Sequence, residues 1–142
     1  MHKVVVDTNI FISAVIKERS KPGQLLNLVK EKKIVLVLSP DILSEIETVL
    51  FYPRLMRIHQ LKEKAIRAYL KKIESISQIV MPTKHLEVIK EDPSDDIYLE
   101  CAVAGQADFI ISGDHHLKDL KSYEGIRILS PAVFLKTLQN EK

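Results

Sequence analysis

Four short apolar runs constrain the fold of this chain more than any other feature. Three of them contain no polar residue, which is typical of strands covered on both faces, and the fourth contains only Arg127. The segments between them carry apolar residues at helical spacing. Strands that alternate with helices predict a parallel sheet with helices on both sides. The four runs are Val4–Val6, Ile34–Leu38, Phe109–Ile111 and Ile126–Leu129.

Two of the runs are followed by the same helix-start signal. Ser39-Pro40 and Ser130-Pro131 place a capping hydroxyl before a proline that suits the first helical turn. They predict a helix from Pro40 that ends before Pro53, and a last helix from Ala132 to Leu138.

The remaining helices are predicted from apolar spacing. We expect Ser20 to Gly23 to be a break, and Gly105 to stop the helix of small residues. The segment 85–91 stays unassigned. The expected helices cover 10–16, 25–29, 55–59, 61–79 and a stretch that opens at 92–94 and runs to 105.

These elements predict a three-layer α/β/α fold, Rossmann-like, with a central parallel sheet of four or five strands. A length of 142 residues is typical of one domain, and 46% apolar with 28% charged residues is an ordinary globular composition. There is no internal repeat or linker. We therefore expect a single domain over residues 1–142.

Composition also restricts the cellular setting. No apolar stretch approaches the ~20 residues that span a bilayer, and the first apolar run is too short for a signal peptide. The single cysteine, Cys101, excludes an internal disulfide and a cysteine-rich zinc site. We expect a soluble, cytoplasmic protein without a membrane partner. A net charge of +2 leaves nucleic acid open as a ligand.

Acidic residues stand where a parallel sheet collects its ligands, at the carboxyl ends of the strands. Asp7 directly follows the first run, and Asp114 comes three residues after Ile111. Glu45 lies at the edge of the apolar face of its helix, and Asp96 on the packed side of the helix of small residues. All four carboxylates could face one pocket.

Carboxylates gathered in this way repel one another, and a hard divalent cation is the usual compensation. Mg²⁺ or Mn²⁺ is the natural candidate. Such an ion can orient and activate a water for attack on phosphorus, which predicts phosphodiester hydrolysis.

Each acid also has a simpler interpretation. Asp7 and Asp114 could be turn residues, and Glu45 a solvated helix residue. Asp41 and Asp92 are better explained as helix-start residues.

Other polar groups have simple explanations as well. The pair His115–His116 could indicate a transition metal, but adjacent histidines point in different directions and no third ligand is near in sequence. Cys101 is interpreted as a core residue. The hydroxyl of Ser112 could form a hydrogen bond within a turn. The basic residues are interpreted mostly as solvated helix faces, with phosphate binding as the alternative: Lys30, Lys32, Lys33, Lys62, Lys64, Arg67, Lys71 and Lys72.

The order of these motifs resembles the PIN-domain family. The motifs are Val-Val-Val-Asp-Thr-Asn at the start, Ser-Pro followed by Glu45, Asp95-Asp96 before a helix of small residues, and Ile-Ile-Ser-Gly-Asp near the end. The resemblance covers almost the whole chain and includes the VapC ribonucleases of toxin–antitoxin pairs. It implies a Mg²⁺ or Mn²⁺ site formed by four acids: Asp7, Glu45, Asp96 and Asp114.

The resemblance implies supporting roles for Asn9 and Ser112, beside the first Asp or a water on the metal. It leaves open whether Asp95 joins Asp96. The implied protein is an endoribonuclease toxin with an RNA substrate, an antitoxin partner and a homodimeric state.

Two other functions are weighed against this one. A phosphatase of the haloacid dehalogenase type also begins with a strand and an Asp, but it requires Asp-x-Asp, and Asn9 occupies the second place here. A non-catalytic RNA-binding or antitoxin-binding module with the same fold remains the alternative.

Overall fold

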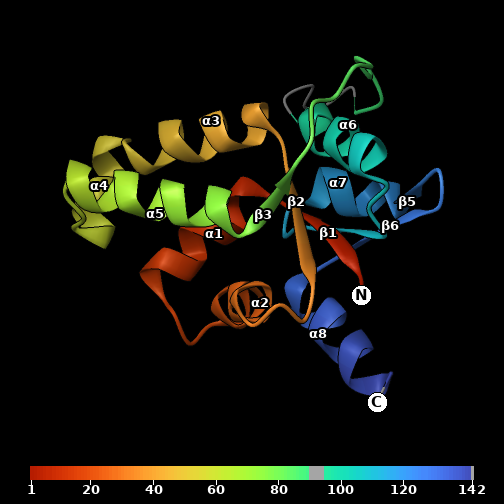
Figure 1. The fold of residues 1–142 in the computed structure, drawn as a ribbon, viewed down its shortest axis with the longest axis horizontal. Helices are drawn as coiled ribbons and strands as arrows, with labels where there is room; N and C mark the ends of the chain where they lie inside the picture. Colours follow the sequence, from red (N-terminus) through yellow and green to blue (C-terminus); the bar gives the residue numbers. More distant parts are fainter. Residues whose placement is uncertain (90–94, 142) are drawn as a thin grey trace.

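The structure, a computed structural model, describes residues 1–89 and 95–141, without the side chains of His115 and His116. One or more helices separate successive strands along it, as expected, except between β5 and β6 (Figure 1). The strands are β1 Lys3–Val6, β2 Val35–Leu38, β3 Ser77–Ile79, β4 Phe109–Ile111, β5 Ser122–Tyr123 and β6 Ile126–Leu129. The helices are α1 Thr8–Ile16, α2 Lys21–Lys30, α3 Pro40–Leu50, α4 Pro53–His59, α5 Glu63–Ser75, α6 Asp96–Gly105, α7 His115–Leu120 and α8 Pro131–Asn140.

The sheet has six strands in the order β3-β2-β1-β4-β6-β5, with β1 and β4 at its centre. All neighbouring strands are parallel except β5, which is antiparallel to β6. The predicted parallel sheet is confirmed, and its count of four or five strands is wrong. The two strands that sequence reasoning missed lie at the sheet edges. Their sequences, Ser-Gln-Ile and Ser-Tyr, contain polar residues and form no apolar run.

The helix predicted over 61–79 ends at Ser75, and its last turn is replaced by β3. Ile76 and Ile79 continue the apolar spacing, which explains the error. The Ser77 hydroxyl donates to the Ile73 carbonyl at 2.5 Å, a local bond that satisfies a carbonyl of the last turn. The chain then extends and pairs with β2.

Serine side chains begin three of the helices. Ser39 and Ser130 accept hydrogen bonds from the backbone N–H groups of Ile42 and Val133, as their Ser-Pro pattern predicts. The expected break at residues 20–23 is instead the start of α2, with Ser20 as its cap. Its proline comes one residue later than in the other two pairs and still falls within the first turn.

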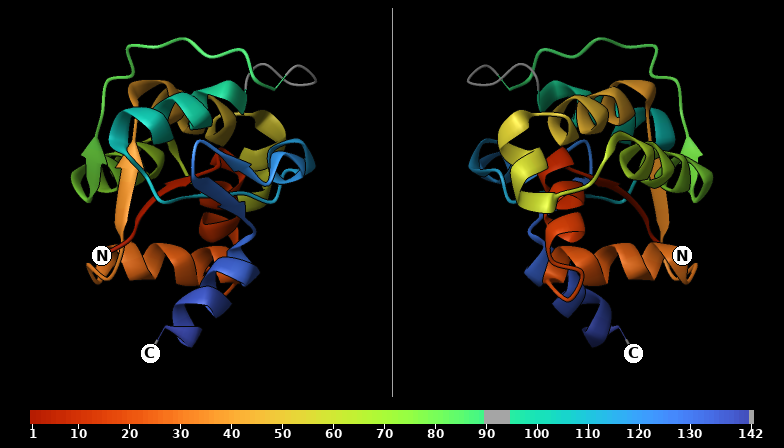
Figure 2. Two further views of the ribbon diagram at one scale, coloured as in Figure 1. Left: turned by 90° about the vertical axis from the view of Figure 1, so that its right-hand side faces the viewer. Right: turned by 90° about the vertical axis from the view of Figure 1, so that its left-hand side faces the viewer.

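Helices cover both sides of the sheet. Helix α6 packs against β1, β2 and β4, while α2 contacts α1 and α8. Figure 2 shows α6 on one side of the sheet, and α2 and α8 on the other. Cys101 of α6 is fully buried, as expected, and burial raises the pKa of its thiol to about 12. Among the described helices, none is long and apolar enough to cross a membrane.

Helix α6 approaches the sheet closely through Gly105. A Cβ added at this glycine would overlap Cγ1 of Val37, which is fully buried in β2. Gly105 ends the helix, as expected, but the left-handed residue that follows the helix is Gln106, with φ of 53°. The glycine is therefore needed for packing and not for its backbone conformation.

We expect Gly105→Ala to lower the free energy of unfolding by about 1–3 kcal/mol, because the added methyl group overpacks the contact with Val37. Urea unfolding measures this. The control is Gly113→Ala, where a Cβ would meet no atom within 4 Å, and its effect should be under about 0.5 kcal/mol. Stabilisation by Gly105→Ala, as at an ordinary helical glycine, would contradict the packing explanation.

Candidate active site

The two central strands bring Asp7 and Ser112 together. Strands β1 and β4 are parallel, with Val6 opposite Ile111, so the residues that follow them meet at the carboxyl edge. The Ser112 hydroxyl donates to Oδ2 of Asp7 at 2.7 Å, and the Asp7 backbone N–H donates to the Ile111 carbonyl at 3.0 Å. Both side chains are buried, Asp7 with 4% and Ser112 with 0% of its surface exposed.

Asp7 is held on both of its carboxylate oxygens. Oδ1 accepts the backbone N–H of Asn9 at 3.3 Å, so Asp7 also caps α1. Burial is the main cause that raises the pKa of Asp7 above its ordinary value, and the negative charge of Asp114 adds to it. Hydrogen bonds to Ser112, Asn9 and Tyr98 act in the opposite direction. The fold therefore holds this carboxylate where its charge is costly.

Asp114 is connected to Asp7 through the same serine. Its backbone N–H donates to the Ser112 hydroxyl oxygen at 2.9 Å, while that hydroxyl donates to Asp7. The Asp114 carboxylate accepts the Leu117 N–H at 3.3 Å, in the first turn of α7. One buried hydroxyl thus fixes the relative positions of two predicted acids.

Tyr98 of α6 is a site residue that sequence reasoning missed. Its hydroxyl donates to Oγ1 of Thr8 at 2.7 Å and accepts the Thr8 N–H at 3.2 Å. Burial, followed by the charges of Asp7 and Glu45, raises the pKa of Tyr98. Tyr98 therefore lies close enough to Asp7 and to Glu45 of α3 for their charges to act on it. The available signal was a hydroxyl-bearing aromatic two residues after Asp96, in a helix of small residues.

Asp96 is directed toward the segment that precedes it in the sequence. Its Oδ1 accepts the backbone N–H groups of Val88 at 3.1 Å and Ile89 at 2.9 Å, and the side chain is 3% exposed. Asp95, which precedes the first residue of α6, is also buried. Both acids lie at the start of α6. The choice between them as metal ligands stays a prediction.

Glu100, one turn after Asp96, holds the same segment. It accepts the Leu86 N–H at 2.8 Å and pairs with Nδ1 of His85 at 3.1 Å. Two carboxylates on α6 therefore anchor residues 85–89. The expected opening of this helix at residues 92–94 lies outside the described residues.

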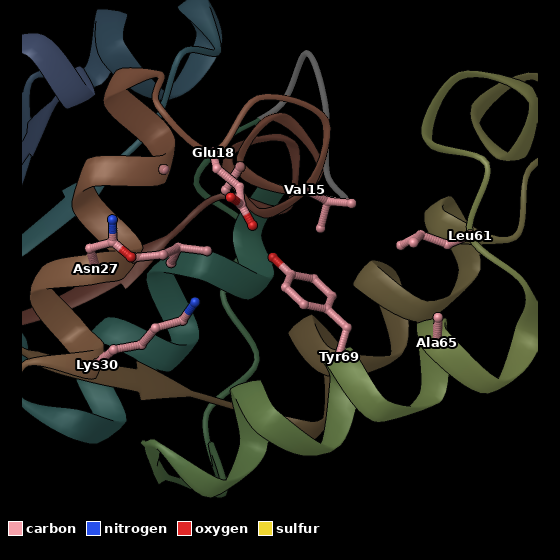
Figure 3. Close-up of a pocket in the computed structure, with 10 residues that line it drawn as sticks. Val15, Glu18, Asn27, Lys30, Leu61, Ala65 and Tyr69 are labelled. Carbon is pink, nitrogen blue, oxygen red and sulfur yellow. The ribbon is translucent and has the colours of Figure 1, made fainter.

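Two surface hollows differ in their relation to the acids. One of about 490 Å³ adjoins the site, and Asn9, Gly113 and Asp114 are among the residues that line it. Another, of about 390 Å³, lies between α1, α2 and α5, and none of the four predicted acids is among the residues that line it. In Figure 3, Tyr69 projects into the second hollow, toward Glu18. Its hydroxyl donates to the Phe11 carbonyl at 3.0 Å and so ties α5 to α1.

The side chains at the carboxyl edge fit a divalent cation in part. Asp7 and Asp114 are hard oxygen donors whose close negative charges a cation would offset, whereas one oxygen of Asp96 already accepts two N–H groups. Among residues 1–89 and 95–141, no three Asp, Glu, His or Cys side chains gather closely enough to hold an ion. The four-acid metal site stays a prediction. The alternative of a transition metal at His115–His116 concerns side chains outside the described part.

The fold and this edge define a small α/β protein with buried acids after its central strands. The PIN domain family model matches residues 3–116, and the chain belongs to this family. An uncharacterized protein of Methanocaldococcus jannaschii, MJ1680, is 39% identical over 119 residues, which are 84% of this chain and 75% of that protein. PIN domains are generally nucleases that use divalent metals.

Solved structures share the fold at low sequence identity. VapBC2 from Rickettsia felis, bound to a DNA fragment from its promoter, has a chain with a TM-score of 0.58 and 15% identity, covering 89% of this chain and 96% of that one. PAE2754 from Pyrobaculum aerophilum has a TM-score of 0.52 and 13% identity, covering 95% of this chain and 88% of that one. The predicted PIN-like architecture is confirmed.

The raised pKa of Asp7 predicts how Asp7→Asn changes stability with pH in a chelating buffer. At low pH the Asp7 carboxyl is protonated in both the folded and the unfolded protein, so its burial does not reduce stability through a buried charge. As the pH rises above the ordinary carboxyl range, about pH 4, the unfolded chain ionises first and the wild type loses stability. The variant, which has no such charge, should therefore gain stability relative to the wild type until the folded-state pKa is passed.

Urea unfolding across this pH range measures the difference. The same change at Asp119, exposed on α7, should alter stability by less than about 0.5 kcal/mol. An advantage of Asp7→Asn that grows as the pH falls would show that burial does not disfavour the charge.

Proposed function

We propose that this protein is a metal-dependent endoribonuclease and the toxin of a toxin–antitoxin pair. The observation that carries the proposal is the arrangement of Asp7, Ser112 and Asp114, in which one buried hydroxyl joins two acids at the carboxyl edge of the central strands. Membership of the PIN-domain family supports it.

We assign the metal to four acids, Asp7, Glu45, Asp96 and Asp114. A Mg²⁺ or Mn²⁺ ion bound there would supply the positive charge that activates a water and stabilises a departing oxygen of the RNA backbone. Ser112 orients Asp7 through its hydrogen bond. Asn9 and Asp95 support the site from the start of α1 and from the residue before α6.

The proposed partners are an RNA substrate, an antitoxin protein and a second copy of the chain. One chain of the structure named VapBC2 shares the fold, which supports an antitoxin as partner. The single buried thiol suits a reducing cytoplasm. The alternative, a module that binds RNA or antitoxin without cutting, differs from the proposal only in activity.

Purified protein should cut RNA with Mg²⁺ or Mn²⁺ and stop when a chelator is added. Asp7→Asn should lower the rate by about a hundredfold or more, because the variant loses a ligand of the ion whose positive charge would stabilise the transition state. Gel analysis of labelled RNA measures both. The control Asp41→Asn, an exposed acid one turn before Glu45, should retain cleavage. Binding of RNA without cleavage in any metal would support the non-catalytic module instead.

Metal binding can also be followed without activity. Mn²⁺ should raise the melting temperature of the wild type, because a ligand that binds only the folded form stabilises it. Asp96→Asn should weaken this shift while keeping the fold, since an amide oxygen can still accept the N–H groups of Val88 and Ile89. Asp95→Asn should keep most of the shift, because adjacent helical residues point about 100° apart. The reverse result would assign the ligand to Asp95.

A further inference from the structure

Positive charge is concentrated in one part of the chain. Residues 53–75, which contain α4 and α5, carry seven of the 21 basic residues and two of the 19 acidic ones. The whole chain has a net charge of only +2, so the rest of it is net acidic. All seven basic side chains are exposed: Arg54, Arg57, Lys62, Lys64, Arg67, Lys71 and Lys72. We call the surface that they form the basic face.

Helix geometry turns these charges outward. On α5, Lys64 and Lys71 lie seven residues apart, on the side opposite the buried Ile66, Leu70 and Ile73. On α4, Arg54 and Arg57 are three residues apart and so share a side. Every residue of α4 is at least partly exposed. Figure 1 shows α4 at the left-hand end of the molecule, where it joins α3 to α5.

Internal carboxylates neutralise little of this charge. Arg67 pairs with Glu63 at 3.2 Å and with Glu47 at 3.8 Å, and its guanidinium lies over the ring of Phe51. Within the described part of the chain, it is the one basic side chain of the seven that forms an ion pair. The other six charges face solvent and are available to a polyanion.

An aromatic side chain adjoins the basic face. Tyr52 directly precedes α4, and half of its surface is exposed at 51%. A tyrosine beside arginines is a combination that binds single-stranded nucleic acid, with the base on the ring and the phosphates on the cations. Tyr52 comes two residues after the last residue of α3, the helix that carries Glu45, so the basic face follows directly on that helix in the chain.

We propose that the basic face binds the phosphate backbone of a single-stranded RNA, with Tyr52 stacked against one of its bases. The choice of RNA among polyanions rests on the proposed function. A second copy of the chain suits this surface poorly, because two such faces would bring like charges together.

Binding is tested in chelator, where no cleavage is expected, so the result does not depend on activity. The probe is a short fluorescein-labelled single-stranded RNA followed by polarisation from about 50 to 200 mM salt. Arg54→Ala with Arg57→Ala should weaken binding roughly tenfold at low salt and reduce the slope of log K against log salt by about 1.4, at roughly 0.7 per lost contact. The matched control is Lys118→Ala with Lys136→Ala, two exposed lysines of α7 and α8.

Tyr52→Ala should weaken binding roughly fivefold or more without changing the salt slope, and Tyr52→Phe should restore it, because the ring supplies the stacking. Equal losses in the arginine pair and the lysine control would overturn the proposal, as would tighter binding of polyglutamate than of RNA. Wild-type binding that depends on these residues, in a protein that cuts no RNA with any metal, would retain this proposal and remove the proposed nuclease.

Discussion

The parallel pairing of β1 with β4 is the constraint on which the site depends. Because Val6 lies opposite Ile111, Asp7 and Ser112 leave the sheet side by side and can share a hydrogen bond of 2.7 Å. A shift of this register by one residue would turn Asp7 away from Ser112. The buried strands therefore form the core and also set the spacing of the polar groups at their ends.

The hydrogen bond between Asp7 and Ser112 also helps to explain how the fold keeps a buried carboxylate whose charge is unfavourable. Burial raises the pKa of Asp7, and several kinds of support offset part of that cost: a hydroxyl, a helix N-terminus and a tyrosine. Each comes from a different element, α1, α6 or the turn after β4. The site is thus distributed over the chain and assembled only when the sheet has formed.

The sequence predicted elements correctly where a local pattern of residues has one strong structural explanation. Apolar runs, one of them interrupted by Arg127, identified four strands, and serine followed by proline identified the starts of α3 and α8. It failed where the signal lies in tertiary contacts. Strand β3 continues a helical pattern, and the role of Tyr98 depends on Thr8, ninety residues away in the chain. The hydrogen bonds of Asp96 to residues 88 and 89 are likewise invisible in a motif.

Two carboxylates anchor residues 86–89, and hydrogen exchange of the backbone amides in this segment can therefore report on those carboxylates. The amides of Leu86, Val88 and Ile89 each donate to a side chain of α6. Such amides exchange with solvent only when the local bond opens. Leu86 reports on Glu100, while Val88 and Ile89 report on Asp96, so their exchange rates distinguish changes at the two carboxylates. An event that draws Asp96 toward the strand ends would speed exchange at two neighbouring amides and leave the third as an internal reference.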